Sequence, residues 1–147
     1  VSVDLTLLHD STIATYMRSA MSHYNSLQSY VKLVEVTSTP TTRGHIKATD
    51  AWYPWESWTG NAYNSWYGGW PIDTYYNNVE AVKIVFNTAT YFEDATTNQK
   101  IATPRHELGH AIGLGHRSSK DLLMYCSRAR TVYGLTSGDI EILDIIY

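Results

Sequence analysis

Residues that cross-link a fold or carry it through a membrane are scarce in this chain. Among 147 residues there is a single cysteine, Cys126, so no disulfide can form within the chain. No apolar run is long enough to span a bilayer. The formal net charge is only −3 and both signs are mixed along the sequence, which argues against a surface for nucleic acid or anionic membrane. The fold must therefore be held by packing and by any metal ion that it binds, and nucleic acid is not an expected partner.

Linkers and internal repeats are missing as well. A length of 147 residues is typical of one domain, so we expect residues 1–147 to form a single domain. The chain is rich in tyrosine and tryptophan, which fits an exported protein, and many exported bacterial enzymes contain no disulfides. We therefore expect a secreted, extracellular protein. Because no signal peptide is visible, the chain would be the processed form of that protein. The sequence does not indicate an oligomeric state.

The most informative segment is HELGHAIGLGH, which runs from His106 to His116. On an α-helix His106 and His110 lie one turn apart on the same face, so both imidazoles can bind one metal ion at about 2 Å. Gly113 can adopt the left-handed conformation that ends a helix, which lets the chain turn and bring His116 in as a third ligand. Three histidines with an open fourth position are typical of catalytic zinc.

Glu107 stands beside the first of these histidines, outside the register of the ligands. It can therefore reach a zinc-bound water without filling the coordination position that the water needs. This spacing predicts zinc-dependent hydrolysis with Glu107 as general base. An amphipathic helix that carries histidines by chance would not explain three histidines, a glutamate and a glycine in register. The other histidines, His9, His23 and His45, lack partners at ligand spacing and are interpreted as surface or packing residues.

The whole segment matches HExxHxxGxxH, the long zinc signature of the metzincins. Leu123-Met124-Tyr125 and the ending 135–140 further resemble the matrixins, the branch that contains the matrix metalloproteinases and their bacterial relatives. The resemblance implies a zinc metalloendopeptidase that cuts peptide bonds in proteins. It also implies an α+β, zincin-like fold with a mixed twisted sheet, an N-terminal helix, a zinc-site helix, a Met-turn and a C-terminal helix.

Within that family, Met124 would form an apolar floor under the three imidazoles without binding zinc. Asp139 would brace this turn, or it would simply favour the dipole at the start of the last helix. Two matrixin features are missing: a propeptide cysteine switch and a His-x-Asp set for a structural zinc. We therefore expect one catalytic zinc ion. Calcium binding is left open, because no spacing of acidic residues resembles a calcium loop.

Hydrophobic periodicity predicts the order of the elements. It indicates strands at residues 3–8, 31–36 and 44–49, and a first helix after Asp10. The resemblance to the matrixins implies two more strands, at 60–63 and 81–86. A polar connection over 87–98 should lead to the zinc helix, which begins near Gln99, or near Thr103 if Pro104 must lie in its first turn. The capping pair Thr136 and Asp139 predicts a last helix from there to residue 147.

The resemblance places a substrate cleft between two segments. The first looks like the edge strand above a matrixin cleft, where an extended peptide binds through main-chain hydrogen bonds; its residues are Gly60, Asn61, Ala62 and Tyr63. The second follows the methionine, and its candidates are Tyr125, Arg128, Arg130 and Tyr133. An inward arginine would shorten the pocket or favour polar or acidic side chains, whereas two solvated loop arginines would do neither. Cys126 is expected to be a buried thiol.

All five tryptophans lie within residues 51–76, together with five tyrosines. Glycines and prolines interrupt this segment, so we expect a long loop with short strand pieces. Its rings could wall the unprimed side of the cleft or stack on sugars, or they could cover the sheet as a local core.

Two other functions stay open at this point. The chain could be a zinc hydrolase of another metzincin branch that acts on cell-wall peptides. It could also be a non-catalytic module that binds glycan or protein through residues 51–76. The presence of Glu107 argues against a lost activity, which would most simply appear as a replacement of that residue.

Overall fold

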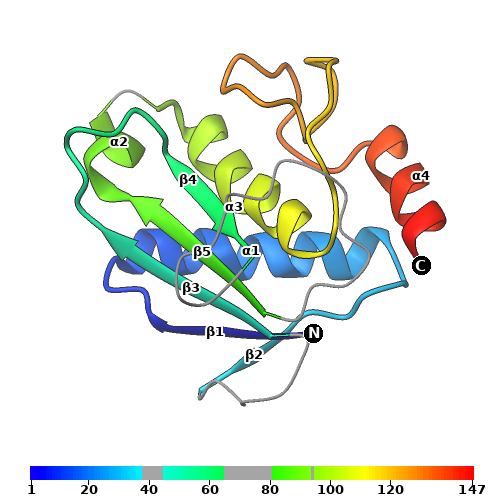
Figure 1. Cartoon of the computed structure of the whole chain (residues 1–147), viewed down its shortest axis with the longest axis horizontal. Helices are drawn as coiled ribbons and strands as arrows, with labels where there is room; N and C mark the ends of the chain where they lie inside the picture. Colours follow the sequence, from blue (N-terminus) through cyan, green and yellow to red (C-terminus); the bar gives the residue numbers. More distant parts are fainter. Residues whose placement is uncertain (38–44, 65–80, 94) are drawn as a thin grey trace.

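The computed structural model describes residues 1–37, 45–64, 81–93 and 95–147, and it has the predicted α+β architecture (Figure 1). The strands are β1 (Ser2–Leu7), β2 (Val34–Val36), β3 (His45–Ala51), β4 (Gly60–Tyr63) and β5 (Ala81–Asn87). The helices are α1 (Ser11–Leu27), α2 (Thr88–Glu93), α3 (Thr97–Ala111) and α4 (Ser137–Ile146). Among the described helices, none is both long and apolar enough to cross a membrane.

The strands form one mixed sheet in the order β2-β1-β3-β5-β4. β2, β1, β3 and β5 run parallel to one another, and α1 provides the crossover between β1 and β2. β4 runs antiparallel to β5, with Gly60 opposite Phe86 and Tyr63 opposite Lys83. β4 is the last strand of the described sheet, so the prediction of an edge strand at 60–63 is confirmed.

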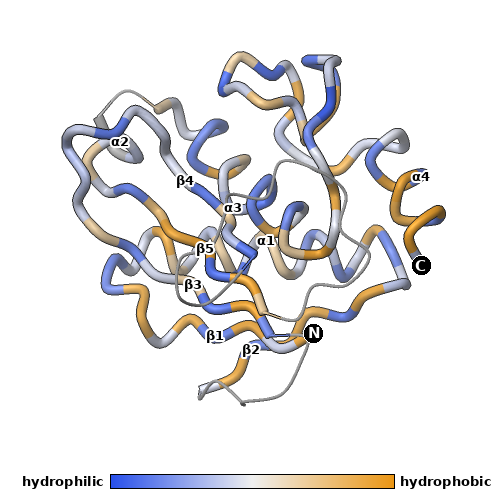
Figure 2. Tube along the Cα trace, in the orientation of Figure 1, coloured by the Kyte–Doolittle hydropathy of each residue, from blue (hydrophilic) through white to orange (hydrophobic). Residues whose placement is uncertain are grey.

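The two long helices α1 and α3 pack against each other on one face of the sheet (Figure 1). α1 begins at Asp10, whose side chain accepts hydrogen bonds from the Thr12 and Ile13 amides as an N-cap. Apolar side chains recur along α1 at helical spacing and are buried: Ile13, Met17, Ala20, Met21 and Tyr24. They share one hydrophobic cluster with side chains of the central strands, whose apolar residues are visible in Figure 2.

The predicted polar connection over 87–98 is wrong, because it contains α2 and the start of α3. Asn87 caps α2 by accepting a hydrogen bond from the Ala89 amide at 3.1 Å. α2 has only six residues, which is too short for a hydrophobic period to reveal. α3 begins at Thr97, with Thr96 and Gln99 forming a capping box that the sequence analysis missed.

Pro104 lies inside α3, although it was expected only in a first turn. A proline lacks the amide that would donate to the carbonyl four residues earlier, which here belongs to Lys100. The hydroxyl of Tyr91 donates to that carbonyl at 2.5 Å. A side chain from α2 thus supplies the donor that Pro104 removes, and the helix continues.

The strand expected over 31–36 is shorter than predicted, since only β2 (Val34–Val36) pairs. In the residues just before β2, side-chain amides form the main-chain hydrogen bonds that a neighbouring strand would otherwise provide. Gln28 bonds both the amide and the carbonyl of Val31, at 2.9 and 2.6 Å. Asn25 does the same for Leu33, at 2.8 Å for each bond. The alternating apolar residues Val31 and Leu33 are buried as predicted, but in an extended segment outside the sheet.

Candidate metal centre and cleft

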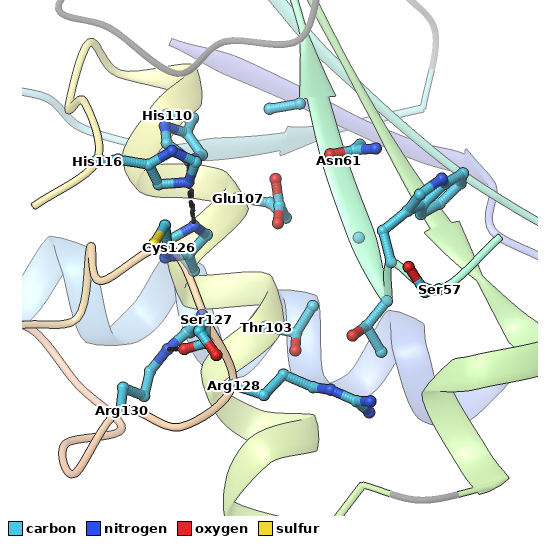
Figure 3. Close-up of a pocket in the computed structure, with 15 residues that line it drawn as sticks. Ser57, Asn61, Thr103, Glu107, His110, His116, Cys126, Ser127, Arg128 and Arg130 are labelled. Atoms are coloured by element: carbon cyan, nitrogen blue, oxygen red, sulfur yellow. Dashed lines mark hydrogen bonds between the residues drawn. The ribbon is translucent and has the colours of Figure 1, made fainter. Parts of the chain in front are cut away.

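The three histidines of the zinc motif converge at the end of α3 (Figure 3). The Nε2 atoms of His106 and His110 are 3.1 Å apart, and Nε2 of His116 lies 3.3 and 3.1 Å from them, respectively. α3 ends at residue 111, and Gly113 follows with a φ of 101°, in the left-handed region that favours glycine. As expected, this turn carries His116 back toward the helix. Within the described residues, no other group of histidines, cysteines and carboxylates has this geometry.

Hydrogen bonds to carbonyl groups fix which ring nitrogens carry protons. Nδ1 of His106 lies 2.9 Å from the Leu123 carbonyl, and Nδ1 of His110 lies 2.8 Å from the Leu114 carbonyl. A carbonyl only accepts, so both Nδ1 atoms must be protonated, and in the neutral ring the lone pair is then on Nε2. Burial, together with the nearby charges of His110 and Arg130, holds the pKa of His106 well below its usual value. Neutral rings whose lone pairs face one another fit a bound cation, and three imidazoles fit zinc.

Met124 packs against the underside of the zinc helix. Its side chain is buried, and a Cβ placed on Gly109 would lie 2.5 Å from the Met124 sulfur and 2.8 Å from the Tyr24 hydroxyl oxygen. The glycine inside HELGH therefore lets the thioether and the hydroxyl approach the helix backbone. Met124 therefore contacts α3 between His106 and His110 along the chain, and its role as an apolar floor under the histidines stays a prediction.

The Asp139 carboxylate, which is almost fully buried, holds the methionine turn from the other side. Its Oδ2 accepts from the Leu123 amide at 3.1 Å and its Oδ1 accepts from the Met124 amide at 3.4 Å. It also accepts from the Thr136 amide at 3.0 Å in the capping box of α4. The two expected roles of Asp139 are thus compatible, and one carboxylate performs both.

Glu107 lies on α3 where β4 crosses close to the helix. A Cβ on Gly60 would lie 3.1 Å from Cγ of Glu107 and 3.0 Å from Cγ2 of Thr103, so this residue of the strand sits almost against the helix. Burial raises the pKa of Glu107 to about 8, although the charge of Arg130 and a hydrogen bond from the Ala62 amide lower it. A cation held by the adjacent histidines would lower it further, because opposite charge favours the ionised carboxylate.

A family model described as matrixin matches residues 37–147. The chain belongs to the matrixin family. Matrixins are zinc-dependent metalloproteases, and the three histidines of this chain could hold a metal ion. A "Putative matrix metalloproteinase" of Spodoptera frugiperda ascovirus 1a is 40% identical over 53 residues, which cover 36% of this chain and 14% of that relative. The chain thus matches only a small part of the length of this curated relative.

The cleft of this matrixin is a cavity of about 410 Å³ beside the histidines (Figure 3). Residues 57–62, which lead into and form β4, make one wall. Residues 126–128 and Arg130, which follow the methionine turn, make the other. α3 contributes Thr103, His106, Glu107 and His110 between these walls. The cleft therefore lies between the two segments that the sequence analysis named.

The residues predicted to bind substrate divide into those that line the cavity and those that do not. Those that line the cavity are Gly60, Asn61, Ala62, Arg128 and Arg130. Those that lie outside its described lining are Tyr63, Tyr125 and Tyr133. Ser57, Thr59 and Thr103 also line it and were not predicted, whereas Trp58 belongs to the aromatic segment for which a cleft wall was one of the expected roles. Thr103 stands one helical turn before Glu107, a spacing that could have identified it.

Two expectations about the wall after the methionine are wrong. Cys126 is exposed and lines the cavity, although a buried thiol was expected. The interpretation of both arginines as solvated fails for Arg130, which is only 8% exposed. The chain returns toward α3 after Ser127, whose carbonyl accepts a hydrogen bond from Nε of Arg130 at 3.3 Å. Arg130 is thus bonded to its own segment and lines the cavity.

The aromatic segment is described only up to residue 64, so its second half lies outside the described residues. Trp52 and Trp55 are 66% and 87% exposed, which excludes a local core for these two rings. Trp58 is partly buried and lines the cavity. The buried amide of Asn87 holds the loop by donating to the carbonyls of Tyr53, Glu56 and Trp58, at 2.9, 3.2 and 3.2 Å. Residues 52–59 therefore form a loop that is anchored at the rim of the cleft and leads into β4.

Proposed function

We propose that this matrixin is a zinc-dependent endopeptidase that hydrolyses peptide bonds in proteins. The observation that carries the proposal is the placement of Glu107 beside three converging imidazoles, in a cavity that opens along an edge strand. His106, His110 and His116 would hold the ion. A histidine cluster without a neighbouring carboxylate could serve a purely structural ion, so the glutamate is the feature that favours catalysis.

The reaction would use the chain's own groups as follows. When bound, zinc supplies Lewis acidity and brings the pKa of a water molecule toward about 7. Glu107 would accept a proton from the attacking water and pass it to the leaving nitrogen, so one carboxylate serves both proton transfers. The Ala62 amide, which bonds to this carboxylate, would help to orient it.

The edge strand would position the substrate. β4 pairs with β5 on one side and ends the described sheet on the other. An extended peptide could add to this free side through main-chain hydrogen bonds, with alternate side chains pointing into the cavity. Gly60, Asn61 and Ala62 line the cavity from this strand, so the scissile bond would pass close to Glu107.

The proposal is tested by metal analysis and casein digestion on the wild type and on Glu107→Ala. We expect one zinc per chain in both proteins. Digestion should fall by at least about a hundredfold in the variant, because the general base is lost. Glu141→Ala is the matched control, since Glu141 is an exposed glutamate of α4, and it should keep full activity.

Unchanged digestion by Glu107→Ala would overturn the proposed mechanism. Digestion of cell walls but not of casein would instead favour the cell-wall alternative.

A further inference from the structure

We propose that Arg128 and Arg130 make this cleft select substrates with an acidic side chain, aspartate or glutamate, next to the scissile bond. The proposal rests on the endopeptidase function above and specifies its substrate class. Both arginines line the cavity that holds the histidines and Glu107. Both also line a smaller recess against Ala102 and Thr103 of α3. Two guanidinium groups therefore face the space that a substrate side chain would enter.

Arg128 extends beneath Thr103 toward the wall that contains Ser57 (Figure 3). Its main chain is fixed because its carbonyl accepts a hydrogen bond from Gln99 at 3.2 Å. Its Nη1 atom is buried and has no hydrogen-bond partner among the described residues. No carboxylate of the described chain forms an ion pair with it. Arg128 thus presents a buried donor that lacks an acceptor.

Arg130 stands closer to the histidines and is more deeply buried. Its Nε donates to the Ser127 carbonyl, and its two terminal nitrogens form no hydrogen bond with any described residue. The charge of Arg130 acts on both Glu107 and His106, which places it near the reacting groups. No ion pair links it to Glu107 or to another described carboxylate. The pocket therefore holds a second cation that lacks a direct counterion.

The free energy of burying these charges decides which substrate fits. A buried guanidinium without a counterion is costly, and an apolar side chain would remove it further from water. A carboxylate would accept its N–H groups and form the stronger, charge-assisted type of hydrogen bond. Glu107 is the only acidic side chain among the described lining residues, and it lies between the histidines and Asn61 in Figure 3. An acidic substrate residue would thus supply the missing anion, and a lysine would be repelled.

The test compares peptides that differ only at one residue next to the scissile bond, after a library digest has located that bond. Glutamate, glutamine, leucine and lysine would be placed there in turn. We expect kcat/KM for the glutamate peptide to exceed that for the glutamine peptide by about tenfold or more, since buried donors discriminate against a substrate that satisfies them poorly. The lysine peptide should be the poorest substrate.

The variants Arg128→Gln and Arg130→Gln should bring this ratio toward one, mainly by slowing the glutamate peptide. Lys120→Gln is the matched control, because Lys120 is exposed and does not line the cavity, so its loss should leave the ratio unchanged. Arg128→Glu should raise cleavage of the lysine peptide. If Arg130→Gln does not fold, the two Arg128 variants are sufficient.

Binding separates failure of this inference from failure of the proposed function. The zinc-loaded Glu107→Ala protein would be titrated with the glutamate and glutamine peptides, and the glutamate peptide should bind at least about tenfold more tightly. Cleavage without a preference for acidic residues, or a preference that survives both arginine variants, would overturn the inference and leave the endopeptidase intact. Selective binding without cleavage by the wild type would overturn the proposed function alone.

Discussion

Two glycines of the zinc motif act in different ways at the residue scale. Gly113 has a positive φ, so it turns the chain after the helix and brings the third histidine back. Gly109 has an ordinary helical conformation. It is needed because it has no side chain, which leaves room for Met124 and Tyr24 to approach the helix backbone. The turn at Gly113 could be predicted from the sequence. The close contact at Gly109 could not, since it depends on side chains from two distant segments.

Gly109→Ala should therefore destabilise the protein, even though alanine favours a helix more than glycine by about 1 kcal/mol. The new methyl group would overlap Met124 and Tyr24, which are both fully packed, and such overpacking costs about 1–3 kcal/mol. Urea denaturation would measure the free energy of unfolding. Ser19→Ala, at an exposed position of α1, is the control and should change stability by less than about 0.5 kcal/mol. Equal or higher stability of Gly109→Ala would contradict the packing described above.

At the level of secondary structure, three local features determine where α3 begins, how it continues past Pro104 and where it ends. A capping box at Thr96 begins it, the Tyr91 hydroxyl from α2 compensates for Pro104, and the turn at Gly113 follows its end. The sequence predicted the end of α3 correctly but not its beginning. The helix pattern cannot reveal that a tyrosine from another helix supplies the donor that a proline lacks.

Tyr91→Phe and Pro104→Ala should be energetically coupled. Removal of the Tyr91 hydroxyl should cost about 1–2 kcal/mol, because the Lys100 carbonyl loses this donor. In the Pro104→Ala background the cost should be smaller by at least about 0.5 kcal/mol, since the amide of alanine can donate to the same carbonyl. Unfolding free energies of the two single variants and the double variant would measure the coupling. The same cost of Tyr91→Phe in both backgrounds would show that the hydroxyl does not serve this function.

At the scale of the whole molecule, the site combines three segments that lie far apart in the sequence. α3 brings two histidines and Glu107, β4 provides the edge beside them, and the segment before α4 supplies Met124 and the two arginines. The order of elements and the histidine cluster could be predicted because their signals are local spacings. The burial of Arg130 and the exposure of Cys126 could not, because they depend on how the walls of the cleft meet.

We expect His106, His110 and His116 to hold one zinc ion and to leave its remaining coordination position to oxygen. X-ray absorption at the zinc edge of the loaded protein tests it most directly, because Cys126 lines the same cavity and offers a competing ligand. We predict three imidazole nitrogens and one oxygen at about 2.0–2.1 Å. The spectrum should not change in Cys126→Ser. A sulfur ligand at about 2.3 Å, or fewer than three imidazoles, would contradict the account.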